Sequence, residues 1–326
     1  MHRRLALLSA VALVSGGTFL TTALPATAST APPPAEEEAA DTKAEQGDVL
    51  DYWTKSKMQN AQPLTVPAPK TGSNGQGEPG QPNTNSPWTA PPTDPQAAVS
   101  TGSQWTKGGA VVKTTGRVFF TYQGRNASCS GSAVTSTNRS VVVTAGHCVK
   151  MGGEFHTNWV FVPGYDNGNR PFGTWVATKL ITTPQWNAKE DINFDIAAAV
   201  VAPQSGKRLQ EVVGGQGIAF NQNRRQQMYS FGYPAASPYN GSKLIHCAGR
   251  AFDDFLLSRD HGLTCNMTGG SSGGPWFVNF NETSGSGTLN SVNSFKYNFA
   301  PNWMFGPYFG NEAQAVYNEA QNTDAT

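Results

Sequence analysis

A serine set among glycines and a histidine about 125 residues before it are the residues of this chain best suited to nucleophilic chemistry. Ser272 lies in Gly270-Ser271-Ser272-Gly273-Gly274-Pro275, and His147 lies in the run 143–148. A serine hydroxyl is a weak nucleophile at neutral pH and needs a base, such as a histidine, to take its proton. The N–H groups of Gly270 and Ser272 can form an oxyanion hole, which contributes about 3–4 kcal/mol per donor.

The order of these parts along the chain excludes two other serine-hydrolase arrangements. Residues 270–274 also fit the G-x-S-x-G elbow of α/β-hydrolases, but that arrangement needs a histidine after the serine, and the last histidine is His261. A subtilisin order needs an aspartate before the histidine, and no acidic residue lies between Asp94 and His147. The order that remains is histidine, aspartate, serine.

The third residue of this catalytic arrangement should be a buried carboxylate that orients the imidazole of His147. Asp195 opens the apolar, strand-like run 195–201 and is therefore expected at the edge of a core. Asp191 is the alternative, but its surroundings are more polar and more typical of a loop. The spacing of the two also resembles the start of a calcium loop, although Ile196 and Ala202 replace the required glycine and glutamate, so no metal is expected.

The motifs around His147, Asp195 and Ser272 resemble those of the chymotrypsin/trypsin-type serine peptidases. The residues that lead into the nucleophile, 268–273, are closer to the secreted bacterial branch that includes the glutamyl endopeptidases. The resemblance covers about residues 105–320 and implies an all-β fold of two antiparallel six-stranded barrels with the site between them. It also implies peptide-bond hydrolysis through an acyl-enzyme.

The resemblance also points to the substrate pocket and to one departure from the family. The pocket positions correspond to Asn266, Met267, Thr268 and Asn293. Because Asn266 replaces the aspartate that selects cationic side chains, trypsin-like specificity is disfavoured, whereas a preference for glutamate stays open. Ser271 stands where the animal enzymes carry an aspartate that pairs with the new N-terminus, so activation by that ion pair is not expected.

The four cysteines all lie in the region that carries this resemblance. Their even number in a chain with an export signal favours disulfides. By the same resemblance Cys129 pairs with Cys148, and Cys247 and Cys265 then remain to pair with each other. Zinc is the alternative for the His-Cys pairs at 147–148 and 246–247, but no tight ligand spacing supports it.

The N-terminal third differs in composition from the rest. Residues 1–28 read as a signal peptide, because a basic start precedes an interrupted apolar run and a small-residue cleavage site, so we expect a secreted protein without a membrane span. Residues 29–100 hold 12 of the 22 prolines, which predicts a solvated pro-segment or linker over 29–104. This stretch carries net charge −5 and residues 101–326 carry +4, so the pro-segment could dock on the peptidase domain through residues 49–53, although the charges also serve solubility.

Short β-rich runs between Gly, Asn and Pro clusters indicate strands throughout residues 105–326, the predicted peptidase domain. A helix that packs without chemistry is expected to begin near Asn311, with apolar residues at helical spacing. These expected elements are 116–122, 140–144, 159–162, 173–177 and 276–278, together with the terminal helix.

Two functions are compatible with the sequence: a monomeric secreted endopeptidase acting on proteins or peptides, and a binding or adhesion protein on a protease scaffold. A complete set of His147, Asp195 and Ser272 favours the enzyme, because binding alone does not need all three. Scattered basic residues give no basis for a nucleic-acid partner, and no cofactor motif is present.

Overall fold

Six strands close into a barrel between residues 115 and 201. The structure is a computed structural model that describes residues 31–70 and 99–326. The strands are hydrogen-bonded in the order β10-β11-β6-β5-β4-β9, and pairing of β9 with β10 closes the ring. Valines and aromatic residues fill the barrel, and β6 and β11 are buried along their whole length. The bounds are β4 Thr115–Tyr122, β5 Arg125–Ala133, β6 Val141–Thr144, β9 Thr157–Pro163, β10 Trp175–Thr182 and β11 Ala197–Val201.

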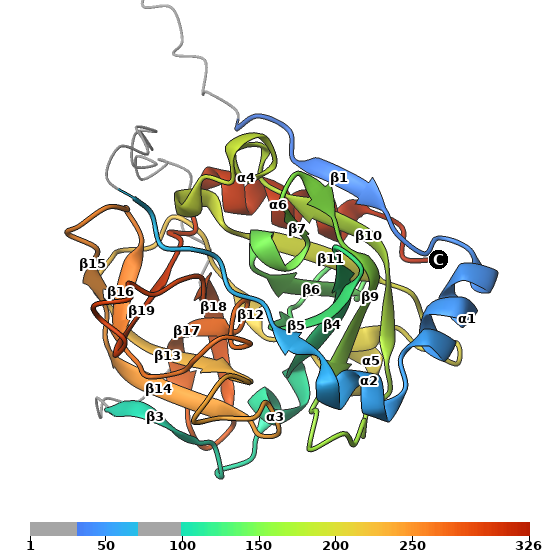
Figure 1. Cartoon of the computed structure of the whole chain (residues 1–326), viewed down its shortest axis with the longest axis horizontal. Helices are drawn as coiled ribbons and strands as arrows, with labels where there is room; N and C mark the ends of the chain where they lie inside the picture. Colours follow the sequence, from blue (N-terminus) through green and yellow to red (C-terminus); the bar gives the residue numbers. More distant parts are fainter. Residues whose placement is uncertain (1–30, 71–98) are drawn as a thin grey trace, which may run out of the picture. The chain divides into compact units, whose positions relative to one another are not determined.

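The second half of the chain forms two sheets (Figure 1). Six strands are hydrogen-bonded in the order β12-β18-β17-β13-β14-β3, and three more in the order β15-β16-β19. Within the described ranges the bridge of Phe295, just after β18, with Phe305 in β19 links the two sheets, but their strand pairing is not continuous, so the expected second barrel stays a prediction. The bounds are β3 Ser100–Gln104, β12 Gly217–Ile218, β13 Gln227–Gly232, β14 Ile245–Arg250, β15 Phe252–Asp253, β16 His261–Thr264, β17 Pro275–Asn281, β18 Ser286–Val292 and β19 Trp303–Gly306.

Shorter elements connect the strands and end the chain. The terminal helix α6, Asn311–Asn322, buries Ala313, Val316 and Ala320, as the apolar spacing predicts. It starts after Gly310, so Asn311 is the first helical residue and not its cap. No helix in the described ranges is long and apolar enough to cross a membrane. The other elements are the hairpin β7 Lys150–Met151 and β8 Glu154–Phe155, the helices α3 Ala110–Thr114, α4 Pro184–Lys189 and α5 Leu209–Val213, and the 3-10 turns η1 Gly146–Cys148 and η2 Ile192–Phe194.

Residues 31–70 have regular structure, contrary to the expectation of a solvated stretch. Strand β1, Ala35–Glu38, pairs with the edge of β10, and helices α1, Lys43–Tyr52, and α2, Lys55–Asn60, follow it (Figure 1). Thr42 and Glu45 form a capping box at the start of α1. Strand β2, Gln62–Pro63, then adds in parallel to β5. The expectation was wrong for residues 35–63 because the prolines that motivated it lie almost entirely outside this stretch.

Trp53 and Met58 anchor this segment on the first barrel. Trp53 is 1% exposed, packs on Phe119 at 5.5 Å between ring centroids and donates from Nε1 to the carbonyl of Asn158 at 2.6 Å. Met58 is fully buried. In the run 49–53, Val49 also lies in the core, whereas the side chain of Leu50 is exposed.

Candidate functional site

His147 and Asp195 form a buried pair where the first barrel faces the second half of the chain. Strand β6 delivers His147 in turn η1, and turn η2 delivers Asp195 just before β11, whose strand pairs with β6. The backbone N–H of His147 donates to Oδ1 of Asp195 at 2.8 Å, and Nδ1 lies 2.8 Å from Oδ2. Neither side chain is exposed to solvent. This arrangement holds the ring with Nε2 free to accept a proton.

Ser294, which the sequence reasoning did not select, completes the surroundings of Asp195. Its hydroxyl donates to Oδ2 at 2.5 Å, so the carboxylate accepts three hydrogen bonds. Ser294 directly follows Asn293, one of the predicted pocket residues, but no sequence motif around Ser294 marks it as a partner of Asp195. Asp191, the alternative carboxylate, instead caps η2 by accepting from the N–H of Asn193.

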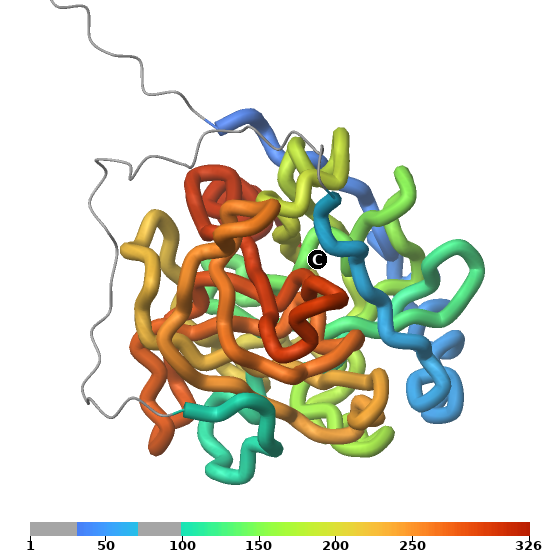
Figure 2. The backbone as a smooth tube through the Cα atoms, turned by 60° about the vertical axis from the view of Figure 1, so that its left-hand side comes forward, coloured from blue at the N-terminus to red at the C-terminus, as the bar shows by residue number. Residues whose placement is uncertain are grey.

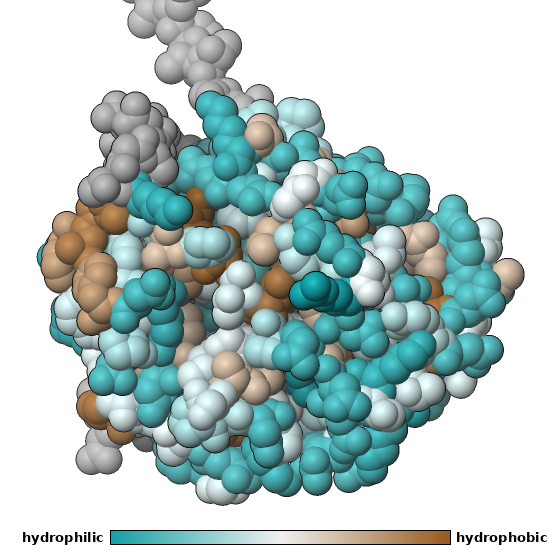
Figure 3. All heavy atoms as spheres, viewed as in Figure 1, coloured by the Kyte–Doolittle hydropathy of each residue, from teal (hydrophilic) through white to brown (hydrophobic). Residues whose placement is uncertain are grey.

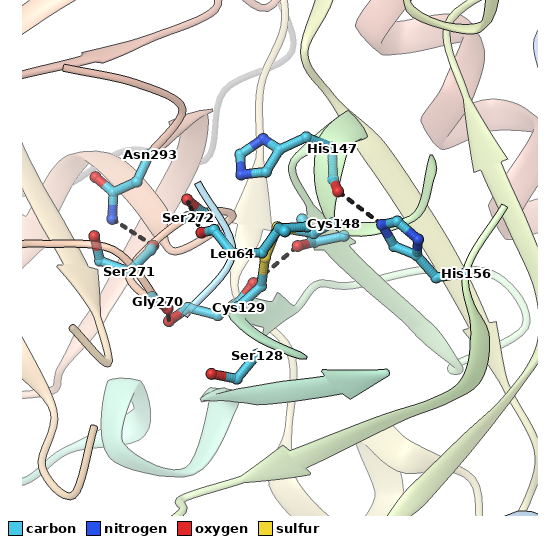
Figure 4. Close-up of a disulfide and its surroundings, with 12 residues drawn as sticks. Leu64, Ser128, Cys129, His147, Cys148, His156, Gly270, Ser271, Ser272 and Asn293 are labelled. Atoms are coloured by element: carbon cyan, nitrogen blue, oxygen red, sulfur yellow. Dashed lines mark hydrogen bonds between the residues drawn. A yellow bond between two sulfur atoms is a disulfide. The ribbon is translucent and has the colours of Figure 1, made fainter. Parts of the chain in front are cut away.

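Ser272 lies in the glycine-rich turn before β17, opposite His147 (Figure 4). Gly270 and Gly273 have φ of 95° and 76°, a region that favours glycine. A Cβ on Gly273 would lie 2.1 Å from Oγ1 of Thr144, so a larger residue would push the turn away from the first barrel. The N–H of Ser130 fixes the turn from β5 by donating to the carbonyl of Ser272 at 2.7 Å.

The contact between nucleophile and base is not made in this conformation. The Ser272 hydroxyl donates to the carbonyl of Leu64 at 3.5 Å, and Nε2 of His147 is buried without a partner among the described residues. The N–H groups of Gly270 and Ser272, the expected oxyanion hole, likewise have no hydrogen-bond acceptor within residues 31–70 and 99–326.

Two solved proteases resemble the chain over nearly their whole length. The protease Anisep from Arthrobacter nicotinovorans is 46% identical, with a TM-score of 0.63, and the match covers 66% of this chain and 98% of that protein. The thermostable serine protease AL20 from an extremophilic microorganism is 45% identical, also at 0.63, over 66% of this chain and 100% of its own. The chain belongs to the chymotrypsin-like serine protease family.

A more distant protease shares the fold alone. A glutamyl endopeptidase solved with a bound MPD molecule is 16% identical, with a TM-score of 0.54, over 68% of this chain and 97% of its own. No protein-family model and no curated protein sequence matches the chain.

Both disulfides of this serine protease are those that the resemblance predicts. Cys129 and Cys148 are joined beside the catalytic histidine (Figure 4), and Cys247 is joined to Cys265 in the second half. His147 lies close to the first pair, but a disulfide sulfur is not the thiolate that zinc requires.

A cavity of about 520 Å³ opens beside the nucleophile of the protease. Of the four residues expected in the substrate pocket, only Thr268 lines it. One wall consists of residues 294–299, with Lys296 among them, and burial lowers the pKa of that ammonium group to about 8. Phe299, at the end of this wall, and Phe255 have exposed rings and line a second hollow. Figure 3 shows hydrophobic residues gathered at one edge of the face.

Met267 and Asn293 do not fit the predicted role in the pocket, because their side chains point into the fold, whereas the half-buried Asn266 stays a prediction. Asn293 is fully buried beneath the nucleophile turn, donates to the carbonyls of Phe231 and Ser271 at 3.0 Å, and accepts from Ser230 and Trp276. With its amide in use, Asn293 holds the turn and cannot bind a substrate carboxylate. Met267 is fully buried in the core of the second half, and Asn266 accepts from the hydroxyl of Tyr239 at 2.6 Å.

Two further residues support the turn and the base of the protease. Ser271, in the position of the animal aspartate, is 1% exposed and donates from Oγ to the carbonyl of Thr268 at 2.8 Å. His156 stacks on Phe120 and lies 2.9 Å from the carbonyl of His147 through Nε2. Burial lowers the pKa of His156 to about 4, so the ring is neutral at pH 7 and its Nε2–H can donate to that carbonyl.

Proposed function

We propose that this protein is a secreted serine endopeptidase in which Ser272 attacks a peptide carbonyl. Residues 1–28 would be its signal peptide, 29–104 its pro-segment and 105–326 its peptidase domain, acting as a monomer on proteins or peptides without a cofactor. The observation that carries the proposal is the buried contact of His147 with Asp195, with Nε2 left free on the side of the nucleophile turn.

Each residue of this site has a defined task in the proposed reaction. Nε2 of His147 takes the proton of the Ser272 hydroxyl as Oγ adds to the carbonyl carbon, and Asp195 stabilises the imidazolium that forms. The N–H groups of Gly270 and Ser272 bind the oxyanion. The imidazolium then gives its proton to the leaving amine, and water hydrolyses the acyl-enzyme by the same route.

Substrate preference follows from the cavity, not from the residues first expected there. The buried amide of Asn293 gives no support to recognition of glutamate, whereas Thr268 and Lys296 do line the cavity. Lys296 lies in the wall of the cavity that residues 294–299 form, and its ammonium group also donates to the carbonyl of Pro301. Lys296 is therefore the residue through which this protease would recognise an acidic substrate side chain.

Digestion of a denatured protein mixture tests the proposal. A site for a sequence-specific protease, placed between residues 70 and 99, allows the N-terminal segment to leave before the assay. The intact serine should produce new termini throughout the substrates, read by mass spectrometry, and Ser272→Ala should reduce cleavage by a factor of about 10⁴ or more. Ser271→Ala is the matched control, since it removes the neighbouring hydroxyl and should keep activity within about tenfold. Equal cleavage by Ser272→Ala and the parent protein would refute the assignment.

A further inference from the structure

Residues 62–70, here called the strap, cross the nucleophile turn (Figure 1, Figure 2). The strap enters as strand β2 beside β5, where the N–H of Leu64 donates to the carbonyl of Ser128 at 3.0 Å. It then lies directly on the backbone before the nucleophile, because a Cβ built on Gly269 would be 2.6 Å from Cγ2 of Thr65.

The second part of the strap fills the apolar side of the cleft. Val66 and Ala68 pack on a cluster of buried residues that includes Phe295 and Tyr297. Residues 65–70 also line the 520 Å³ cavity, together with Thr268 and residues 294–299. The strap therefore contacts both halves of the peptidase across the space where a substrate must lie.

The strap also contacts the candidate nucleophile. The hydroxyl of Ser272 donates to the carbonyl of Leu64 and not to Nε2 of His147. His147 is fully buried, and Ser272 is 5% exposed. Leu64 thus lies beside Ser272, and no hydrogen bond joins Ser272 to His147 in this conformation (Figure 4).

The carbonyl of Leu64 lies near the nucleophile but is not held as a substrate would be. Transition-state stabilisation needs hydrogen bonds from the oxyanion hole to the carbonyl oxygen. The N–H groups of Gly270 and Ser272 make no such bond to Leu64, and no base is engaged with the hydroxyl. Three prolines, Pro63, Pro67 and Pro69, restrict the strap to extended backbone and remove N–H donors that could pair with the cleft.

The segment before the strap is anchored at sites outside the cleft. Trp53 and Met58 are buried on the first barrel, and β1 pairs with β10. This attachment keeps the strap at an effective concentration on the order of millimolar, because binding to the cleft is then intramolecular.

We propose that the active-site cleft is also a binding site for an extended, apolar, proline-containing peptide, and that residues 62–70 occupy it as a built-in inhibitor. The proposal rests on the proposed function, since an inhibitor requires an activity. Release of the strap lets the Ser272 hydroxyl turn to Nε2 of His147 and opens the cavity to substrate.

The test compares the rate at which a fluorophosphonate probe labels Ser272, together with hydrolysis of a fluorogenic peptide library, in the full uncut chain and its variants. Val66→Lys with Ala68→Lys puts two cations into the apolar contact, in a cavity that already contains Lys296, and leaves the catalytic residues unchanged. Because burial of an unpaired charge is unfavourable, both rates should rise at least about tenfold. Gln62→Lys is the matched control, because that strap side chain is exposed and lies outside the cavity, so its rates should match those of the parent chain.

The outcomes separate this inference from the proposed function. Equal and rapid labelling of the parent chain and the double variant would overturn the strap as inhibitor and leave the peptidase assignment intact. No labelling and no hydrolysis in any folded variant would overturn both.

A second measurement does not depend on the folding of a variant. A synthetic peptide of residues 62–70, added to the protease after its N-terminal segment has been cut off and removed, should inhibit competitively. The same peptide with Val66→Lys should bind about tenfold more weakly. Absence of inhibition by the unmodified peptide would overturn the proposal.

Discussion

The hydroxyl of Ser272 lies 3.5 Å from the carbonyl oxygen of Leu64, a residue 208 positions earlier in the chain. Ser272 and the N-terminal segment thus meet in one site, and the hydroxyl makes no hydrogen bond to His147 there. The protein combines a preformed His147–Asp195 pair with a nucleophile that is not yet coupled to it.

The carboxylate of Asp195 should matter far more than that of Asp191. Asp195→Asn removes the charge that stabilises the imidazolium, and kcat/KM of the segment-free protease should fall about 10⁴-fold. Asp191→Asn is the control, because Asp191 caps η2 without contacting His147, and its kcat/KM should stay near that of the parent. Similar losses in the two variants would show that the assignment of the orienting carboxylate is wrong.

Ser294 should have a smaller effect than Asp195, since it acts through that carboxylate. Loss of a hydrogen bond to a charged group costs about 1.5–3 kcal/mol, so Ser294→Ala should lower kcat/KM about 10- to 100-fold. The apparent pKa on the acidic limb of the pH–rate profile should also shift, since the environment of His147 and Asp195 changes. A lower thermal stability with unchanged kcat/KM and pH profile would instead indicate a purely structural role.

Stability should fall in mild acid because of His156. In the folded state its pKa is lowered to about 4, whereas the unfolded chain has the ordinary value of 6.5. Below pH 6.5 the unfolded chain therefore binds a proton that the folded protein does not, and the free energy of unfolding decreases as the pH falls towards 4. The measurement is urea unfolding of Ser272→Ala, a variant that avoids self-digestion. Between pH 7 and pH 4.5 its free energy of unfolding should fall by roughly 2–3 kcal/mol because of His156.

The control for this acid effect is His156→Phe in the same background. Phenylalanine can keep the stacking on Phe120 but cannot titrate. The fall in the free energy of unfolding between pH 7 and pH 4.5 should therefore be smaller in His156→Phe, by the amount attributed to His156. His261, whose pKa burial lowers to about 3, is present in both proteins and contributes equally to them. An identical pH dependence of the two proteins would contradict the prediction.

Trp53 should hold the N-terminal segment on the barrel. Trp53→Ala leaves a cavity against Phe119 and removes the hydrogen bond to Asn158, a loss of about 3–5 kcal/mol for a buried tryptophan. Hydrogen exchange of the amides in α1 and α2 should become faster, while the barrel strands keep their protection. Leu50→Ala, at an exposed position of α1, should leave hydrogen exchange in α1 and α2 and in the barrel strands unchanged.

The disulfides and the contact of His147 with Asp195 could be predicted because short motifs carry these residues. The sequences around His147, Asp195 and Ser272 are local, and their order along the chain excludes the other arrangements. Asp195 was preferred over Asp191 by the apolar run that follows it, and that run is strand β11, beside the strand that ends at His147.

Features that depend on tertiary contacts could not be predicted in the same way. Family position placed Asn293 in the substrate pocket, but the chain turns its amide inward to hold Phe231 and Ser271. The contact of Ser294 with Asp195 joins residues 99 positions apart, and no local pattern reports it.

The expectation that the N-terminal segment has no packed structure is wrong for a different reason. Proline content averaged over residues 29–100 concealed the proline-free stretch 35–62, although the capping residues Thr42 and Glu45 mark a helix start. The stability of these two short helices comes from burial of Trp53 and Met58 on the barrel, which composition does not reveal.

The central claim is that Ser272 is the nucleophile, and its most direct test is the mass of the protease after reaction with a fluorophosphonate. In the form freed of residues 31–70 we expect a single adduct, located on Ser272 by peptide mapping, with loss of hydrolysis in proportion to the labelling. Ser272→Ala should remain unlabelled. Full labelling at another residue with equal loss of activity, or persistent hydrolysis by a fully labelled Ser272, would contradict the account.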